Sequence, residues 1–178
     1  MKFKNIIVSD KSNNSLDLYD IVYSNITVIN LLREEGVEDS LIHPDSLISY
    51  FIDYYLAQNN NGGFSQFVYN SRWNDDLNSK IKLGLKNIEA TEHLKYFRSQ
   101  KLVVESISQE ELNSFFESKY FGENETRDKL KNDAYFDIDE NLIDLNGKWL
   151  KNHSDLKVLT IDNMFEEIEK HIGREIKR

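Results

Sequence analysis

Two adjacent glycines, Gly62 and Gly63, constrain the folding of this chain more than any other feature of its sequence. Before them, apolar residues repeat at three- and four-residue intervals over residues 47–58, which predicts an amphipathic helix. After them, a shorter apolar pattern predicts a second helix that ends near Ser71. Glycine adopts positive φ angles without a steric penalty, so the pair predicts a tight corner at which one helix ends and another begins at once.

Two polar residues that follow the glycines are expected to complete this corner. Gln66 and Asn70 are four residues apart and therefore share one face of the second helix. Buried amides need hydrogen-bond partners, so we expect both side chains to satisfy backbone groups that the corner frees. A glycine turn before a helix can also bind phosphate, but a P-loop requires a lysine and a hydroxyl where this chain has Phe64-Ser65-Gln66. We therefore interpret the stretch as structural.

The remaining pattern predicts an all-α protein. Helical apolar spacing recurs, besides the two helices at the corner, over residues 15–35, 77–88, 92–104, 109–122, 139–152 and 163–172. Seven or eight helices joined by short turns predict a compact multi-helix globular domain. Strand is expected at most near the N-terminus, where residues 1–14 form an arm or a short strand, and at residues 156–160. Because linker-like composition is absent, residues 1–178 are expected to form a single domain.

Acidic residues dominate the charge, and they are unevenly placed. The net charge is −9, from 31 acids and 22 bases, and residues 102–146 contain twelve acids and four bases, a net of −8. Such a field repels nucleic acid and anionic lipid, so neither nucleic acid nor a membrane is expected as a partner, whereas a basic protein surface would be attracted. Ordinary solubility accounts for the same acidity and stays open as an explanation.

No residue pattern in the chain carries the chemistry of an enzyme or a cofactor site. There is no cysteine, and the four histidines are far apart and outside any metal-binding spacing. The acids around residues 133–144 lack the central glycine and the closing glutamate of an EF-hand loop. We therefore expect no catalytic residue, metal or cofactor. No apolar run reaches the length of about 18 residues that spans a bilayer, and a cysteine-free chain suits the reducing cytoplasm, where we expect this protein.

The corner carries a family resemblance. The run Asn60-Asn61-Gly62-Gly63-Phe64-Ser65-Gln66-Phe67, followed by Tyr69-Asn70-Ser71, resembles the signature of the bacterial DNA mimic protein family, most of which is described as a domain of unknown function. The resemblance is most specific over residues 47–71. Members of that family are small, acidic and mainly helical. The signature residues in this chain are Asn60, Asn61, Gly62, Gly63, Phe64, Gln66, Phe67 and Asn70.

The resemblance implies a non-enzymatic, protein-binding role. One characterised family member is understood to act as a dimer whose surface acids imitate DNA phosphates and occupy the DNA-binding face of a transcription factor. By this resemblance the partner would be a basic DNA-binding regulator and the protein a homodimer. Local charge density selects one candidate acidic surface, made of Asp133, Asp137, Asp139, Glu140 and Asp144. A second candidate group consists of Glu34, Glu35, Glu38 and Asp39.

Two other functions stay open. The chain contains ten Phe, nine Tyr and two Trp, and exposed aromatic side chains would suit a homo-oligomeric structural protein. A helical domain that binds a small ligand, or an enzyme, would instead need a pocket beneath the glycine corner, lined by Gln66, Asn70 and nearby tyrosines. Salt-sensitive binding to a basic partner would favour the acidic interaction protein. A monomer at high concentration would exclude the oligomer, and a solid core at the corner would exclude the pocket.

Overall fold

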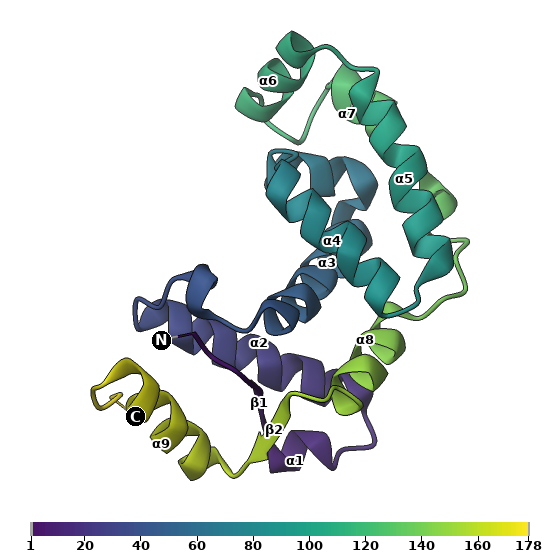
Figure 1. Cartoon of the computed structure of the whole chain (residues 1–178). Coiled ribbons are helices and arrows are strands. Elements are labelled where there is room, and N and C mark those ends of the chain that lie inside the picture. Colours follow the sequence, from purple (N-terminus) through teal and green to yellow (C-terminus); the bar gives the residue numbers. More distant parts are fainter. Residues whose placement is uncertain (1, 178) are drawn as a thin grey trace. The chain divides into compact units, whose positions relative to one another are not determined.

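Residues 2–177 are described by the computed structural model, and helices make up 68% of the structure (Figure 1). The predicted all-α class is therefore confirmed. The helices are α1 (Asp10–Asn13), α2 (Leu18–Glu34), α3 (Pro44–Ser71), α4 (Asp75–Asn87), α5 (Thr91–Glu105), α6 (Gln109–Glu117), α7 (Glu125–Leu130), α8 (Leu142–Lys151) and α9 (Ile161–Ile172). The other described elements are two 3₁₀ turns and two strands, η1 (Asp39–Leu41), η2 (Asp133–Tyr135), β1 (Ile6–Ser9) and β2 (Leu156–Leu159).

The number of helices agrees with the sequence. Within the described residues, α1 and α7 have only four and six residues, and α3 joins two helices across a kink. When the two halves of α3 are counted separately, eight longer helices remain in that range, as predicted.

Contacts within the chain divide it into two compact units. The terminal unit contains the chain up to Tyr50 and from Ile143 onward, and the central unit is Phe51–Leu142. Each unit has its own buried core. A single domain over residues 1–178 stays a prediction.

A small parallel sheet contributes to the core of the terminal unit. β1 and β2 pair over all four of their positions, and every residue of β1 is buried. The β-branched side chains of β1 suit such a buried strand. Ile6 and Val8 pack against Ile21 and Val22 of α2 and against Leu150 of α8. Both places at which the sequence allowed a strand are thus confirmed.

Helix α8 touches the start of α2 within the terminal unit. A Cβ atom at Gly147 would lie 2.5 Å from the backbone oxygen of Leu18. Only glycine therefore allows the two helices to approach this closely. Nearby, the buried side chain of Asn25 donates from Nδ2 to the carbonyl of Ser46 at 2.9 Å, which fixes α2 against the start of α3.

Two His-x-Asp turns cross-link the terminal unit. His43-Pro44-Asp45 stands at the start of α3, and His153-Ser154-Asp155 stands between α8 and β2. Nε2 of His43 lies 3.3 Å from Oδ2 of Asp155, and Nε2 of His153 lies 3.1 Å from Oδ2 of Asp45. In each turn, Nδ1 of the histidine accepts a hydrogen bond from the backbone N–H of the aspartate two residues on. Neutral rings with their proton on Nε2 satisfy all four contacts.

Aromatic side chains form the core of the central unit. Phe64 and Phe67, from the second half of α3, are fully buried. They make edge-to-face contacts with Tyr55, Trp73 and Phe97, with ring centroids 5.4–6.3 Å apart. Each such pair contributes about 0.5–1.5 kcal/mol beyond the burial of its surface. The corner in α3 therefore positions two of the most deeply buried residues of this unit.

Two helices are shorter than predicted, for reasons that lie outside their own sequences. α6 ends at Glu117 instead of near residue 122, because Ser118 is extended and its carbonyl accepts a hydrogen bond from the hydroxyl of Tyr69 at 2.7 Å. α8 begins at Leu142 instead of at residue 139, because the preceding Glu140 binds the start of α5.

Candidate functional site

The glycine corner has the backbone geometry that its sequence predicts. Gly63 has φ 70° and ψ −170°, a region open essentially to glycine alone. At Gly62 the constraint is space, because a Cβ atom would lie 2.9 Å from the Cβ of Gln66. The carbonyl of Gly62 accepts hydrogen bonds from the hydroxyls of Ser65 and Tyr120, at 3.2 Å and 3.1 Å. Hydroxyl groups therefore satisfy the backbone oxygen at the break in the helix.

The two amide residues of the corner bind a different partner from the one predicted. Gln66 Nε2 and Asn70 Nδ2 both donate to Oε1 of Gln58, at 3.4 Å and 2.6 Å. They join the two halves of α3 through a side chain and leave the freed backbone oxygen to hydroxyl groups. Of the other signature residues, Asn60 and Asn61 are exposed, and Phe64 and Phe67 are buried in the aromatic core. The signature thus builds a corner and presents no reactive group.

The first candidate acidic surface is divided between the two units. Asp133, Asp137 and Asp139 are exposed on the segment between α7 and α8, within the central unit. None of the three forms an ion pair with a described residue. Asp144 belongs to the terminal unit and is half-buried.

The fifth member of that surface, Glu140, holds the start of α5. Its carboxylate accepts hydrogen bonds from the hydroxyl of Thr91 at 2.8 Å and from the backbone N–H groups of Glu92 and His93 at 2.8 Å and 3.1 Å. The residue before the helix, Ala90, has no side chain that could cap it. Burial raises the pKa of Glu140, but these hydrogen bonds together hold the pKa below its usual value. Glu140 is therefore engaged within the protein, unlike the three aspartates.

Half of the second acidic group is neutralised by arginine. The carboxylate of Asp39 accepts from Nε and Nη2 of Arg33 at 2.9 Å and 2.8 Å. Glu35 pairs with Arg174 at 2.8 Å. The other two members are exposed and form no ion pair with any residue in 2–177, and these are Glu34 and Glu38.

Sequence reasoning missed part of the acidic surface of the central unit. Three more exposed carboxylates have no ion pair among the described residues, and these are Glu110, Glu123 and Glu125. The carboxylate of their neighbour Glu111 instead accepts hydrogen bonds from Lys129 and Ser108, and these bonds lower its pKa to about 2. The count of acids over residues 102–146 includes both acids without an ion pair and acids that bind other groups of the protein, and only the fold shows which acids belong to which class.

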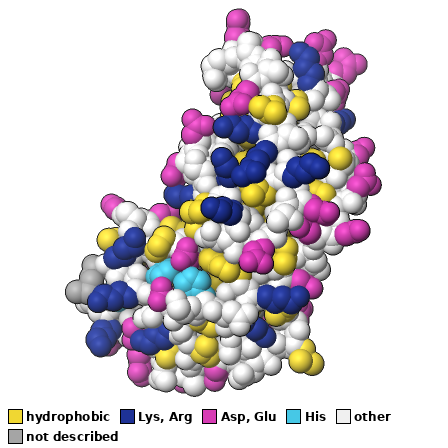
Figure 2. Space-filling model, turned by 45° about the vertical axis from the view of Figure 1, so that its right-hand side comes forward, with side chains coloured by type: hydrophobic (Ala, Val, Ile, Leu, Met, Phe, Trp, Pro, Cys, Tyr) yellow, Lys and Arg dark blue, Asp and Glu magenta, His cyan; other side chains and the backbone are white. Residues whose placement is uncertain are grey.

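The central unit also carries a basic face that sequence reasoning missed. Residues 72–101 contain seven bases and four acids, a net of +3. Figure 2 shows dark-blue basic side chains gathered in the middle of this unit, with magenta acidic ones around them. Helix α5 supplies Arg98 to the hollow that Lys82 and Lys86 of α4 also line. Because these residues come from two helices, their meeting depends on how the helices pack.

Two other kinds of site are absent from the described residues. Within residues 2–177, no three His, Asp or Glu side chains come together in a group that could hold a metal ion. No helix in that range is long and apolar enough to cross a membrane.

Comparison with known proteins identifies a family for this chain. No curated protein and no solved structure matches the chain significantly. The family model of the DMP19-like protein, a DNA mimic family, matches residues 40–153, more than half of the chain. The matched range contains the glycine corner and the whole central unit. The family that the corner signature indicated is therefore confirmed: this chain belongs to the DMP19-like protein family.

Proposed function

We propose that this protein is a DNA mimic without catalytic activity, which binds a basic partner at the face that the partner uses for DNA. Membership of the DMP19-like family supports this role. The observation that carries the proposal is the set of exposed, unpaired carboxylates of Asp133, Asp137 and Asp139 between α7 and α8. A surface that binds DNA phosphates through lysine and arginine attracts these carboxylates by the same Coulomb interaction.

The segment that carries the three aspartates is anchored at several points. The hydroxyl of Tyr96 donates to the carbonyl of Asn132 at 3.2 Å, and Tyr135 is only 5% exposed. Further along, Glu140 is held by the start of α5. The aspartates alternate with these anchors and are therefore held in place before a partner arrives. Binding then costs little conformational entropy, which favours affinity.

The first test is an affinity experiment. The immobilised protein is incubated at low salt with a lysate of its source cell, and bound proteins are eluted with a salt gradient or with duplex DNA and identified by mass spectrometry. We expect a basic DNA-binding protein that is released by moderate salt and by DNA, because charge complementarity holds it. A bound protein that neither salt nor DNA releases would overturn the proposal.

A set of charge-neutralising variants then locates the surface. The variant Asp133→Asn, Asp137→Asn, Asp139→Asn should lose the captured protein, because three unpaired carboxylates are removed without a change of shape. A matched control removes three exposed acids of the terminal unit that form no ion pair among the described residues, through Asp20→Asn, Glu166→Gln and Glu175→Gln. Glu34→Gln with Glu38→Gln tests the second acidic group. Equal capture by the first variant and the control would show that the aspartates are not the surface.

The homodimer that the resemblance implies is a separate expectation. Phe121 and Phe136 of the central unit are 83% and 60% exposed. Large exposed aromatic side chains of this kind are commonly buried in interfaces. Sedimentation velocity over a range of concentrations tests this expectation, and a monomer at the highest concentration would exclude the dimer.

A further inference from the structure

The groove between α4 and α5 of the central unit has the features of a ligand site, which goes beyond the protein-binding role. We propose that it binds a nucleotide. The base lies against Asn78 and Trp73, and the phosphate lies among Lys82, Lys86 and Arg98. A buried amide without a partner, a fixed aromatic wall and a hollow lined by cations support this assignment.

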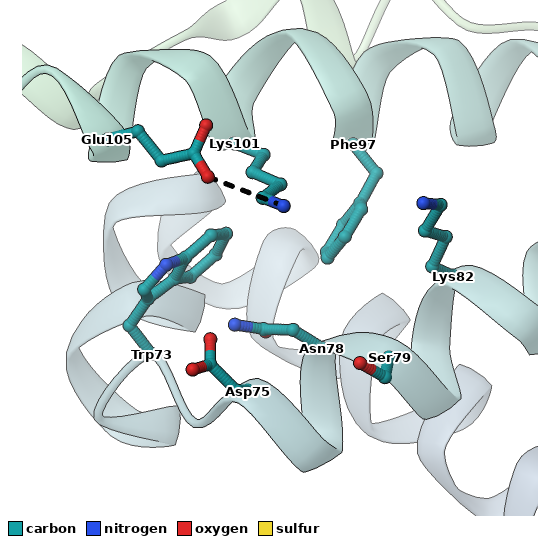
Figure 3. A pocket seen from close by; sticks show the side chains of 8 residues that line it. All are labelled: Trp73, Asp75, Asn78, Ser79, Lys82, Phe97, Lys101 and Glu105. Carbon is teal, nitrogen blue, oxygen red and sulfur yellow. Dashed lines mark ion pairs between the residues drawn. The ribbon is translucent and has the colours of Figure 1, made fainter.

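The groove encloses enough space for such a ligand. A hollow of about 430 Å³ opens between α4 and α5. Figure 3 shows the side chains of Trp73, Asn78 and Phe97 converging on it from the loop before α4, from α4 and from α5. Sites for small ligands typically have volumes of about 300–1,000 Å³ and combine aromatic walls with a few polar groups.

The amide of Asn78 is the most specific feature of the groove. The residue is only 8% exposed, and neither Nδ2 nor Oδ1 has a hydrogen-bond partner among the described residues. Buried polar atoms are nearly always hydrogen-bonded, so an amide with two unpaired atoms beside a hollow needs a partner. Each of the two atoms has less than 1 Å² of accessible surface, so the amide meets a partner from outside the protein by turning toward the hollow. An asparagine amide presents a donor beside an acceptor, which is the complement of a base edge such as N6 and N7 of adenine.

Trp73 forms the wall on which a base can pack. Its indole is stacked on Phe97 at 27°, with centroids 6.1 Å apart, and meets Phe64 edge-on at 5.8 Å. Arg72 and Trp73 have φ angles of 53° and 49°, a conformation that residues with side chains rarely adopt. The strained turn and the packing together hold the indole at one angle. Aromatic side chains stack on any base, because every base has a flat π surface.

Charge along the groove gives the ligand one orientation. A second hollow of about 290 Å³ shares Ser79 and Lys82 with the first and is also lined by Lys86 and Arg98. None of these three cations forms an ion pair with another described residue, so all three remain available to phosphate oxygens. At the other end the groove is lined by Asp75 and by Glu105, which pairs with Lys101 at 3.3 Å. The acids repel a phosphate from that end.

Titration of the isotope-labelled full-length protein, followed by NMR, tests the assignment. Mononucleotides with each of the common bases are compared with adenosine and with inorganic phosphate, the two halves of the ligand. At least one nucleotide should shift the side-chain amide of Asn78 and the indole N–H of Trp73, and each half alone should bind about ten-fold more weakly or worse. Absence of saturable binding at about 10 mM of every nucleotide, or equal binding of phosphate alone, would overturn the proposal.

Variants separate binding from folding. Asn78→Leu removes a buried amide without partners, so the protein should remain folded by circular dichroism while nucleotide affinity falls about ten-fold or more. Lys82→Gln with Lys86→Gln should weaken binding similarly. Lys80→Gln with Lys119→Gln is the control that also removes two positive charges from the central unit, because Lys80 lies on the opposite side of α4 and Lys119 is exposed beyond the end of α6. Unchanged affinity in Asn78→Leu, or equal losses in the control and the lysine pair, would show that the groove is not the site.

Discussion

Replacing Gly63 by alanine should destabilise the protein through its backbone angles alone. At φ 70° and ψ −170°, Gly63 occupies a region that residues with a Cβ atom avoid. No heavy atom lies within 4 Å of the position that a Cβ would take, so the substitution causes no clash with neighbouring groups. The cost is therefore conformational, and such positions cost about 1–3 kcal/mol. We expect Gly63→Ala to lower the free energy of unfolding by about 2 kcal/mol.

A second glycine, Gly173, serves as a control for the effect of the backbone angles. Gly173, at the end of α9, has φ 77° and ψ 20°, the ordinary left-handed conformation, and also has no neighbour within 4 Å of its Cβ position. Asparagine tolerates that conformation better than alanine does. Gly173→Asn should therefore cost less than Gly173→Ala. At Gly63 the ψ angle lies far outside the left-handed region, so Gly63→Asn should cost as much as Gly63→Ala.

Urea unfolding measures these four variants. Far-ultraviolet circular dichroism follows the helices, and fluorescence follows Trp73 in the central unit and Trp149 in the terminal unit. With a slope of about 1–3 kcal/mol per molar urea, a loss of about 2 kcal/mol lowers the midpoint by roughly 1 M. A Gly63→Asn variant with the midpoint of the native sequence would refute the argument from ψ, because only a left-handed corner would explain it.

Three further predictions concern contacts elsewhere in the fold. Glu140→Ala should lower the free energy of unfolding by about 0.5–2 kcal/mol in the same assay, because α5 loses the carboxylate that caps it. Gly147→Ala should cost about 1–3 kcal/mol and lower the thermal midpoint, because its Cβ would lie 2.5 Å from the carbonyl oxygen of Leu18. Burial lowers the pKa of His93, and its buried Nδ1 has no partner among the described residues, so below pH 6.5 the unfolded state binds more protons than the folded state. Stability should then fall between pH 7.5 and 5.5, by at most about 1.4 kcal/mol per pH unit for one proton, and His93→Gln should flatten that decline.

The corner could be predicted because it depends on a local property. Only glycine adopts the angles of Gly63 without strain, and that preference is visible in the sequence. The four-residue spacing of Gln66 and Asn70 also placed both correctly on one face. Their partner could not be predicted, because Gln58 comes within reach only once the corner has set the angle between the two halves of α3.

Other features depend on groups that are distant in the sequence. Glu140 caps α5 from 48 residues away, and the two strands of the sheet come from opposite ends of the chain. The triplets His43-Pro44-Asp45 and His153-Ser154-Asp155 are visible in the sequence as a repeated His-x-Asp. Their pairing is visible only in the fold, because each histidine contacts the aspartate of the other triplet. Local preferences predict that such elements form, whereas tertiary contacts decide which groups meet and, as at α8, where an element begins.

Tertiary contacts also decide which acidic side chains remain available to a binding partner. Among the described residues of the range 105–140, six exposed carboxylates have no ion pair, and these are Glu110, Glu123, Glu125, Asp133, Asp137 and Asp139. The other acids of that range either pair with a lysine or arginine or, like Glu140, cap a helix. The number of carboxylates that a partner can meet is therefore smaller than the net charge suggests.

This smaller number predicts how salt shifts a competition between the protein and DNA. Duplex DNA carries about one charge per 1.7 Å, and it releases condensed counterions on binding, so its affinity for proteins falls steeply with salt. Six carboxylates spread over a folded surface hold no comparable counterion layer, and only screening weakens their attraction. As salt rises, a shared partner should therefore shift from DNA toward this protein. Displacement of a labelled duplex from the partner, followed by fluorescence anisotropy at several salt concentrations, measures that shift, and displacement that becomes less efficient with salt would contradict binding through these carboxylates.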